Sequence, residues 1–177
     1  MRAPIVPASI LCAAWAFASG ALGASPPPLT LDGLGPLKFG MTPGQVAKIV
    51  GPLNISYDAS GPGCGEGGPK RPWIPGVGFM FVHGRLARIS VSEDTGTLPK
   101  SEAGVGVGST VAEVKRAYGK RLRIEIRPYF TEEDGEHDLV VNDAKRRRKL
   151  IFETFKGRIE TFRAGVTGPV DHIEGCA

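Results

Sequence analysis

The chain reads FGMTPGQVAKIVG at residues 39–51 and VGSTVAEVKRAYG at residues 107–119. In each copy a threonine, Thr42 or Thr110, is followed three residues later by Gln45 or Glu113. This is the spacing of a capping box, in which the two side chains bind free backbone N–H groups at the start of a helix. A glycine, which commonly ends helices, closes each copy. The sequence therefore predicts one short capped helix written twice, the first over about residues 42–50.

A β-hairpin is predicted after each helix. Two apolar runs rich in β-branched and aromatic residues, separated by one residue and a glycine, favour a hairpin with a tight turn. The predicted pairs are residues 77–82 with 85–91 around His83-Gly84, and residues 150–155 with 158–162 around Lys156-Gly157. Residues 122–126 alternate in the manner of a half-buried strand, and residues 137–141 are a shorter candidate strand.

The expected fold class is α+β, a tandem repeat of a short capped helix followed by antiparallel strands, with the helices on one face of an antiparallel sheet. Whether the two repeats share one sheet or form two lobes stays open. The predicted segments are 1–24 as signal peptide, 25–32 as extended lead-in, 33–92 as first repeat, 93–103 as linker, 104–165 as second repeat and 166–177 as C-terminal tail.

The first residues have the three parts of a secretory signal peptide: Arg2, an apolar run over residues 5–17, and small residues at 21–24. Cleavage near Gly23 or Ala24 is expected, which places the mature protein in the periplasm or outside the cell. The apolar run is too short to span a bilayer comfortably, and the residues before Cys12 do not fit a lipoprotein signal. The 22 basic and 18 acidic residues of the whole chain give only a mildly basic protein.

Cys64 and Cys176 remain after cleavage, and in an oxidising compartment they most simply pair with each other. Such a bond would close a loop of more than about one hundred residues, which the loop-entropy model values at about 4–5 kcal/mol. The Gly- and Pro-rich residues 52–75 are predicted to form a long loop held by this bond. No metal site and no cofactor are expected, since neither cysteine has a pair of further ligands at suitable spacing.

Three groups of residues are candidate sites. Trp73, flanked by prolines, has the composition of an interface anchor, although it could equally cover the core, and Phe81 is placed on the binding face of the sheet. The cations of the basic run are expected in a hairpin loop, either holding anionic glycan or lipid headgroups or simply solvated. They are Lys145, Arg146, Arg147, Arg148 and Lys149.

His137, Asp138 and Tyr129 are the third group, and they suggest acid–base chemistry in a small hydrolase. The sequence has no Gly-x-Ser-x-Gly motif and no histidine pair at metal spacing, so this hypothesis ranks last.

The Gly-Met-Thr helix start, the x-Gly-Arg hairpin turns and the closing Glu174-Gly175-Cys176 resemble a group of uncharacterised exported bacterial proteins over roughly residues 30–176. The tandem helix–sheet unit is also similar in outline to β-lactamase-inhibitor proteins and to the small lipoprotein of the outer-membrane assembly machine. That resemblance implies binding rather than catalysis.

The sequence thus favours a non-enzymatic exported binding module that engages a protein or cell-envelope component through its sheet face and Gly-rich loop. Electrostatic binding of anionic polymers or lipids by residues 145–149 is the alternative, and nucleic acid is not an expected partner.

Overall fold

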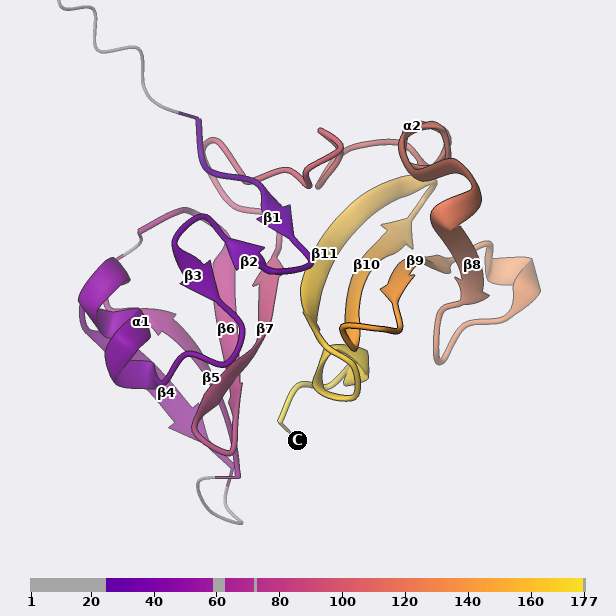
Figure 1. Cartoon of the computed structure of the whole chain (residues 1–177). Helices are drawn as coiled ribbons and strands as arrows, with labels where there is room; N and C mark the ends of the chain where they lie inside the picture. Colours follow the sequence, from indigo (N-terminus) through magenta and orange to yellow (C-terminus); the bar gives the residue numbers. More distant parts are fainter. Residues whose placement is uncertain (1–24, 59–62, 72, 177) are drawn as a thin grey trace, which may run out of the picture.

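Two helices and two antiparallel sheets make up the described chain, so the α+β class is confirmed. The computed structural model describes residues 25–58, 63–71 and 73–176 (Figure 1). The predicted signal peptide and Cys12 lie outside the described residues. The helices are α1 (Pro43–Val50) and α2 (Val111–Tyr118), and three 3₁₀ turns are η1 (Gly119–Arg121), η2 (Glu132–Asp134) and η3 (Pro169–Asp171).

The larger sheet has eight strands in the order β4-β5-β6-β7-β11-β10-β9-β8, and the smaller one is β1-β2-β3. The strands of the large sheet are β4 (Leu53–Tyr57), β5 (Cys64–Pro69), β6 (Val77–Val82), β7 (Arg85–Val91), β8 (Leu122–Ile126), β9 (His137–Asp143), β10 (Arg148–Phe155) and β11 (Arg158–Val166). Those of the small sheet are β1 (Leu29–Thr30), β2 (Gly33–Leu34) and β3 (Leu37–Lys38).

Both capping boxes form as predicted. In α1 the Thr42 hydroxyl accepts a hydrogen bond from the Gln45 N–H at 3.3 Å, and the Gln45 side chain accepts one from the Thr42 N–H at 2.9 Å. In α2 the Thr110 hydroxyl accepts from the Glu113 N–H at 3.2 Å, and the Glu113 carboxylate accepts from the Thr110 N–H at 2.7 Å. Each eight-residue helix is thus fixed at its start by local chemistry.

The two predicted hairpins are β6–β7 and β10–β11. Both turns have positive φ at each central residue, 49° and 68° at His83 and Gly84, and 49° and 76° at Lys156 and Gly157. Positive φ at both positions is the type I′ turn, whose twist matches that of the flanking strands.

One continuous sheet joins the two hairpins, because β7 pairs antiparallel with β11. The pairs run from Val91 opposite Phe162 to Arg88 opposite Gly165. A side chain at position 165 would place its Cβ 2.4 Å from the backbone oxygen of Ala87, so only glycine permits the strands to meet this closely. The two halves of the chain therefore do not form separate lobes.

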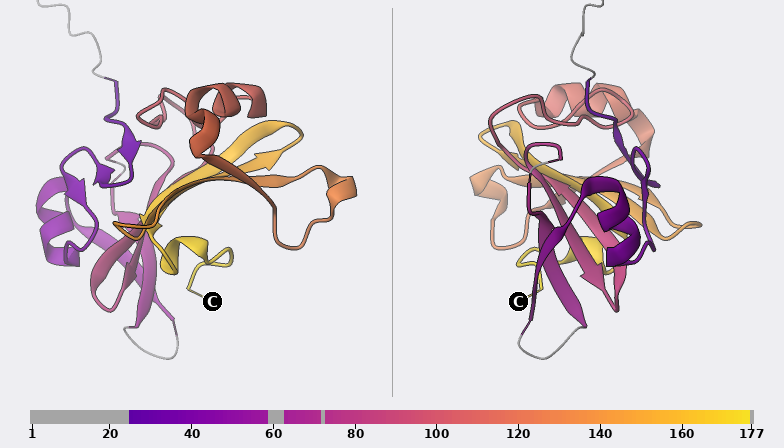
Figure 2. Two further views of the ribbon diagram at one scale, coloured as in Figure 1. Left: turned by 45° about the vertical axis from the view of Figure 1, so that its right-hand side comes forward. Right: turned by 90° about the vertical axis from the view of Figure 1, so that its left-hand side faces the viewer.

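The main hydrophobic core lies on one face of the large sheet, under α1, α2 and the small sheet (Figures 1 and 2). It combines alternate residues of the central strands with the inner sides of the helices and three leucines of the small sheet. Its fully buried large side chains include Leu29, Leu34, Leu37, Phe81, Leu86, Ile89, Leu150, Phe152 and Phe162. The opposite face of the sheet is left for other contacts.

The predicted long loop over residues 52–75 is wrong, because β4 and β5 lie within it. Strand β5 is Gly-rich and shows no apolar alternation, but it is held by pairing with β4 on one side and β6 on the other. A Cβ at Gly65 would lie 2.6 Å from the ring of Tyr57, so glycine lets the side chains of β4 cover its backbone. Tertiary pairing here overrides low β-propensity.

The strand predicted over residues 122–126 is confirmed as β8, but the side that was expected to be buried is partly exposed. Ile124 and Ile126 are 47% and 45% exposed. The reason is position, since β8 is the last strand of the sheet and pairs only with β9 among the described residues.

The predicted disulfide joins Cys64 to Cys176, with the two Cα atoms 5.5 Å apart. It ties the C-terminal segment to β5 on the face of the sheet that the helices leave free (Figure 2). A disulfide of this kind is typical of exported proteins. None of the helices that the structure describes is long and apolar enough to cross a membrane.

Candidate functional site

The face of the large sheet opposite the helices, called here the polar face, carries most of the buried charge of the molecule. Its alternate strand positions present polar and charged side chains where the other face presents the core. The buried charged residues on it are Arg88 of β7, Arg163 of β11, Glu153 of β10 and Asp138 of β9. Four consecutive strands, β7, β11, β10 and β9, thus contribute to one surface, together with Glu66 of β5.

Glu153 is the centre of a buried ion-pair network. Its carboxylate forms an ion pair with Arg163 and accepts a hydrogen bond from the guanidinium group of Arg127 at 3.0 Å. Arg127 also donates to the carboxylate of Glu160 at 3.2 Å. Burial lowers the pKa of Arg163 to about 10. Because a buried charge without its partner is costly, these pairs fix the relative positions of β10, β11 and the end of β8.

The C-terminal segment lies across this network. Val170 of η3 is fully buried and packs on Val140 and Ile151, the two apolar residues of the polar face beneath it. The Val170 carbonyl accepts a hydrogen bond from Nε of Arg163 at 2.7 Å. Lys149 donates to Asp171 at 2.8 Å. The segment is therefore bound to the sheet by side-chain contacts as well as by its disulfide.

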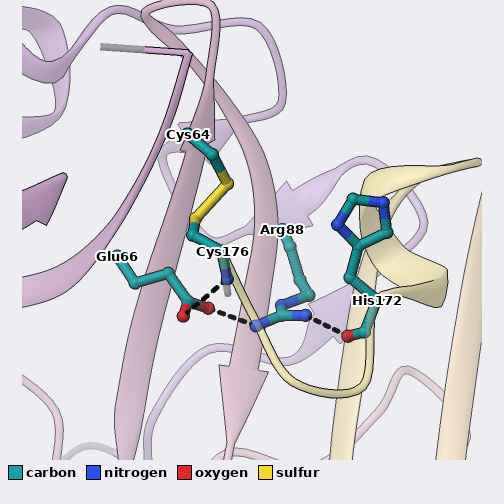
Figure 3. Close-up of a disulfide and its surroundings, with 5 residues drawn as sticks. All are labelled: Cys64, Glu66, Arg88, His172 and Cys176. Carbon is teal, nitrogen blue, oxygen red and sulfur yellow. Dashed lines mark hydrogen bonds and ion pairs between the residues drawn. A yellow bond between two sulfur atoms is a disulfide. The ribbon is translucent and has the colours of Figure 1, made fainter. Parts of the chain in front are cut away.

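Arg88 connects the end of this segment to β5 (Figure 3). Its guanidinium donates to the Glu66 carboxylate and, at 2.6 Å, to the carbonyl of His172. Glu66 in turn accepts from the backbone N–H of Cys176 at 3.2 Å. The three contacts surround the disulfide, so the chain end is held by a polar cluster and a covalent bond together.

A shallow hollow of about 410 Å³ lies on the polar face beside this cluster. Its lining includes Gly67, Gly68, Gly78, Arg88 and Ser90. A Cβ at Gly78 would meet nothing within 4 Å, so this part of the sheet is bare backbone. Among the described residues, Nε of Arg88 is buried and has no hydrogen-bond partner. Glycines inside strands allow another backbone or a ligand to approach closely.

Asp138 gives the polar face a specific pH dependence. Burial raises the pKa of its carboxyl, although the charges of Arg163 and Arg127 act in the opposite direction. The folded protein therefore binds more protons than the unfolded chain between the ordinary aspartate pKa and the raised one. We expect the free energy of unfolding to fall as the pH rises through this interval, and D138N to remove that fall. Urea unfolding at a series of pH values measures it.

D143N is the matched control on the same strand. Hydrogen bonds from Arg146 lower the pKa of the Asp143 carboxyl, so its contribution to stability is present at neutral pH and is lost as the pH falls through the lowered pKa. The two variants should change the stability profile with opposite sign. Identical profiles for D138N and the unaltered protein above pH 4 would contradict the first prediction.

Phe81 is a correction to the predicted site. It is 0% exposed and points into the main core, next to Phe79 at a ring distance of 6.4 Å. The alternation of β6 decides this, because Phe79 and Phe81 face the helices and Met80 faces the other way. Trp73 is partly buried and packs against the main core, so only part of its surface is accessible.

The basic run divides between a turn and a strand, because β10 begins at Arg148. Arg146 forms ion pairs with Asp143 and Asp32, and Lys149 with Asp171. Arg148 lies over the ring of Phe39 at 5.5 Å. Lys145 and Arg147 are exposed in the turn. Two of the five cations are therefore paired with carboxylates, and a third lies over an aromatic ring.

His137, Asp138 and Tyr129 have separate surroundings. The His137 ring contacts the Gly135 carbonyl at 2.9 Å, while Asp138, the next residue of β9, is buried on the polar face. The Tyr129 hydroxyl donates to Glu174 at 3.1 Å, which raises the pKa of Tyr129. Neighbouring strand residues face opposite sides, so the first two side chains diverge.

Sequence reasoning missed Glu66, Arg88 and the glycine hollow. The sequence does contain a signal for Arg88. Arg88 and Ser90 alternate with the apolar Ile89 and Val91, and Ala87 is one extra residue between this run and Leu86. Glu66 and Gly78 carry no such signal, since their place depends on which strands lie beside them. In the part of the chain that the structure describes, no group of three His, Cys, Asp or Glu residues could hold a metal ion.

Comparisons of this chain with protein-family models, with curated proteins and with solved structures give no match in any of the three.

Proposed function

We propose that this protein is an exported, non-enzymatic binding module that engages a protein or cell-envelope component through the polar face and strand β5. The observation that carries the proposal is the glycine hollow on the polar face, with Glu66 and the buried Arg88 at its border. An extended protein segment suits this surface best, because bare glycine backbone accommodates close approach of another main chain.

The rigidity around the hollow supports binding rather than chemistry. Arg88 and Glu66 are fixed by contacts with each other and with the C-terminal segment, and that segment is fixed by Cys176. A surface that is ordered before the partner arrives loses less conformational entropy when it binds. This is the arrangement expected of a recognition surface.

We further infer that the two halves are copies of one unit, each a capped helix followed by four antiparallel strands. The supporting observations are the two capping boxes, the two type I′ turns, and a register shift inside each hairpin, at Met80/Phe81 and at Glu153/Thr154. Joined at β7 and β11, the two copies would present one wide polar face to a partner.

Filling the hollow tests the proposed function. Gly78 has room for a side chain and no positive φ, so G78L should fold normally while occupying the space that a partner needs. We expect immobilised G78L to retain at least tenfold less of any partner that the unaltered protein captures from envelope and periplasmic extract. Elution in rising salt identifies partners held past about 0.5 M, where the Debye length is a few ångströms.

G44L is the matched control. Gly44 also has nothing within 4 Å of its Cβ position and no positive φ, but it lies at the start of α1 on the other side of the sheet. Equal loss of capture in G44L and G78L would mean that the effect is not local to the hollow. If the captured partner is released at low salt and K145Q/R147Q abolishes its capture, the binding site lies in the basic turn instead.

A further inference from the structure

Strand β8 is an open edge whose apolar side the chain uses only at Leu122, which packs against the main core. Ile124 and Ile126 belong to neither hydrophobic cluster of the described residues, and both are nearly half exposed. Open strand edges with apolar side chains are binding sites for further strands, and monomeric proteins usually protect them. The exposed edge of β8 is therefore a candidate site for pairing with a further strand.

The other edge of the sheet differs. The apolar residues of β4, Leu53 and Ile55, pack against the main core, and Tyr57 covers Gly65. Strand β4 thus uses its apolar side within the chain. Both outer strands expose apolar surface, but on β4 this is the single ring of Tyr57, whereas on β8 it is two aliphatic side chains that belong to no cluster.

The sequence of β8 is complementary to itself. Arg123 and Glu125 flank Ile124, and the described residues provide no ion-pair partner for either charge. When two copies of β8 run antiparallel with Ile124 at the centre, Arg123 of each copy lies opposite Glu125 of the other. Leu122 of each then lies opposite Ile126 of the other. Opposite charges and apolar residues that face each other across strands both stabilise a sheet.

The environment of Glu125 supports this pairing. Glu125 lies opposite Asp138 of β9 within the sheet, and its charge helps to raise the pKa of that carboxyl. An arginine from a second copy would offset this repulsion between two carboxylates. Arg127, at the end of the strand, is already paired with Glu153 and Glu160, so its charge is compensated at the margin of the interface.

We infer that a second copy of this chain docks on β8, edge to edge and antiparallel, which makes a two-fold symmetric dimer with one continuous sheet. The assembly stops at two copies, because each copy uses its own β8 in the interface and no further β8 edge remains free. The inference does not depend on the proposed function, since it concerns the outer edge of the sheet rather than the polar face. A five-residue strand buries less than the ~1,200 Å² of a standard interface, so we expect a weak dimer that dissociates in the micromolar range.

Charge exchange across the edge tests the inference. Sedimentation equilibrium of the oxidised protein from about 1 to 500 µM should give a monomer–dimer equilibrium around the range stated above. R123E and E125R should each weaken self-association at least tenfold, because each places like charges opposite one another twice. The double exchange R123E/E125R restores opposite charges and should restore the dimer.

A mixture of the two single variants is the sharpest readout. One variant then presents two glutamates and the other two arginines at these positions, so the mixed dimer should be tighter than either variant alone. S56R, on the opposite edge strand, should leave the dimer unchanged. A protein that stays monomeric at 500 µM, or a dimer that S56R disrupts and E125R does not, would overturn the inference.

Discussion

Replacing both cysteines by serine, C64S/C176S, is expected to lower the free energy of unfolding by about 4–5 kcal/mol. The bond joins residues 112 positions apart, so its loss allows the unfolded chain many more conformations. The backbone N–H of residue 176 can still bond to Glu66 in the variant, so the expected loss comes mainly from the unfolded state. Urea unfolding of the oxidised protein and of the variant measures the difference.

Reduction of the unaltered protein is the control for this prediction. A reductant should bring the unaltered protein to the stability of C64S/C176S and should have no effect on the variant itself. Val170 and its contacts to the sheet remain in both, so η3 should stay in place under native conditions. A variant within 1 kcal/mol of the oxidised protein would show that the loop-entropy argument fails here.

F81A is expected to lower the free energy of unfolding by about 3–5 kcal/mol. Phe81 is fully buried, and its ring lies edge-on to that of Phe79. Removing the ring leaves a cavity between the sheet and the elements that cover it, and the surrounding structure can close such a cavity only in part. Thermal and urea unfolding, followed by circular dichroism, measure the loss.

F155A is the matched control, because Phe155 is an exposed phenylalanine at the end of β10. It contacts Lys156, whose ammonium lies 5.0 Å from the ring centre, so its removal should cost no more than about 1 kcal/mol. If F81A instead kept its stability and lost only partner binding, Phe81 would belong to a binding surface after all.

The local features of the fold could be read from the sequence because each depends on residues close together in the chain. A threonine and a Gln or Glu three residues later are sufficient to start a helix, and a residue before glycine between two apolar runs is sufficient to turn a hairpin. Both helices, both hairpins and the strands β8 and β9 were predictable on this basis. The cysteine pairing was predictable by elimination, since only two cysteines follow the predicted signal peptide.

The candidate site was less predictable than the fold. The sequence pointed to the Gly-rich segment around Cys64, and residues 66–68 of that segment do line the hollow, but the segment was interpreted as a loop. Strand β5 has too little side chain to show a periodic pattern, and it is a strand only because β4 and β6 pair with it. Its pairing with β4 also required Tyr57 to cover Gly65, a contact that propensity does not reveal.

The sequence by itself determined the class of the fold, its capped helices, its hairpins and its disulfide, because short-range hydrogen bonds and turn geometry decide them. Only the tertiary structure decided that the hairpins join at β7 and β11, that Phe81 faces the core, and that the C-terminal segment covers Arg163 and Arg88. These outcomes follow from pairing between distant strands, and that pairing decides which face of each strand is buried.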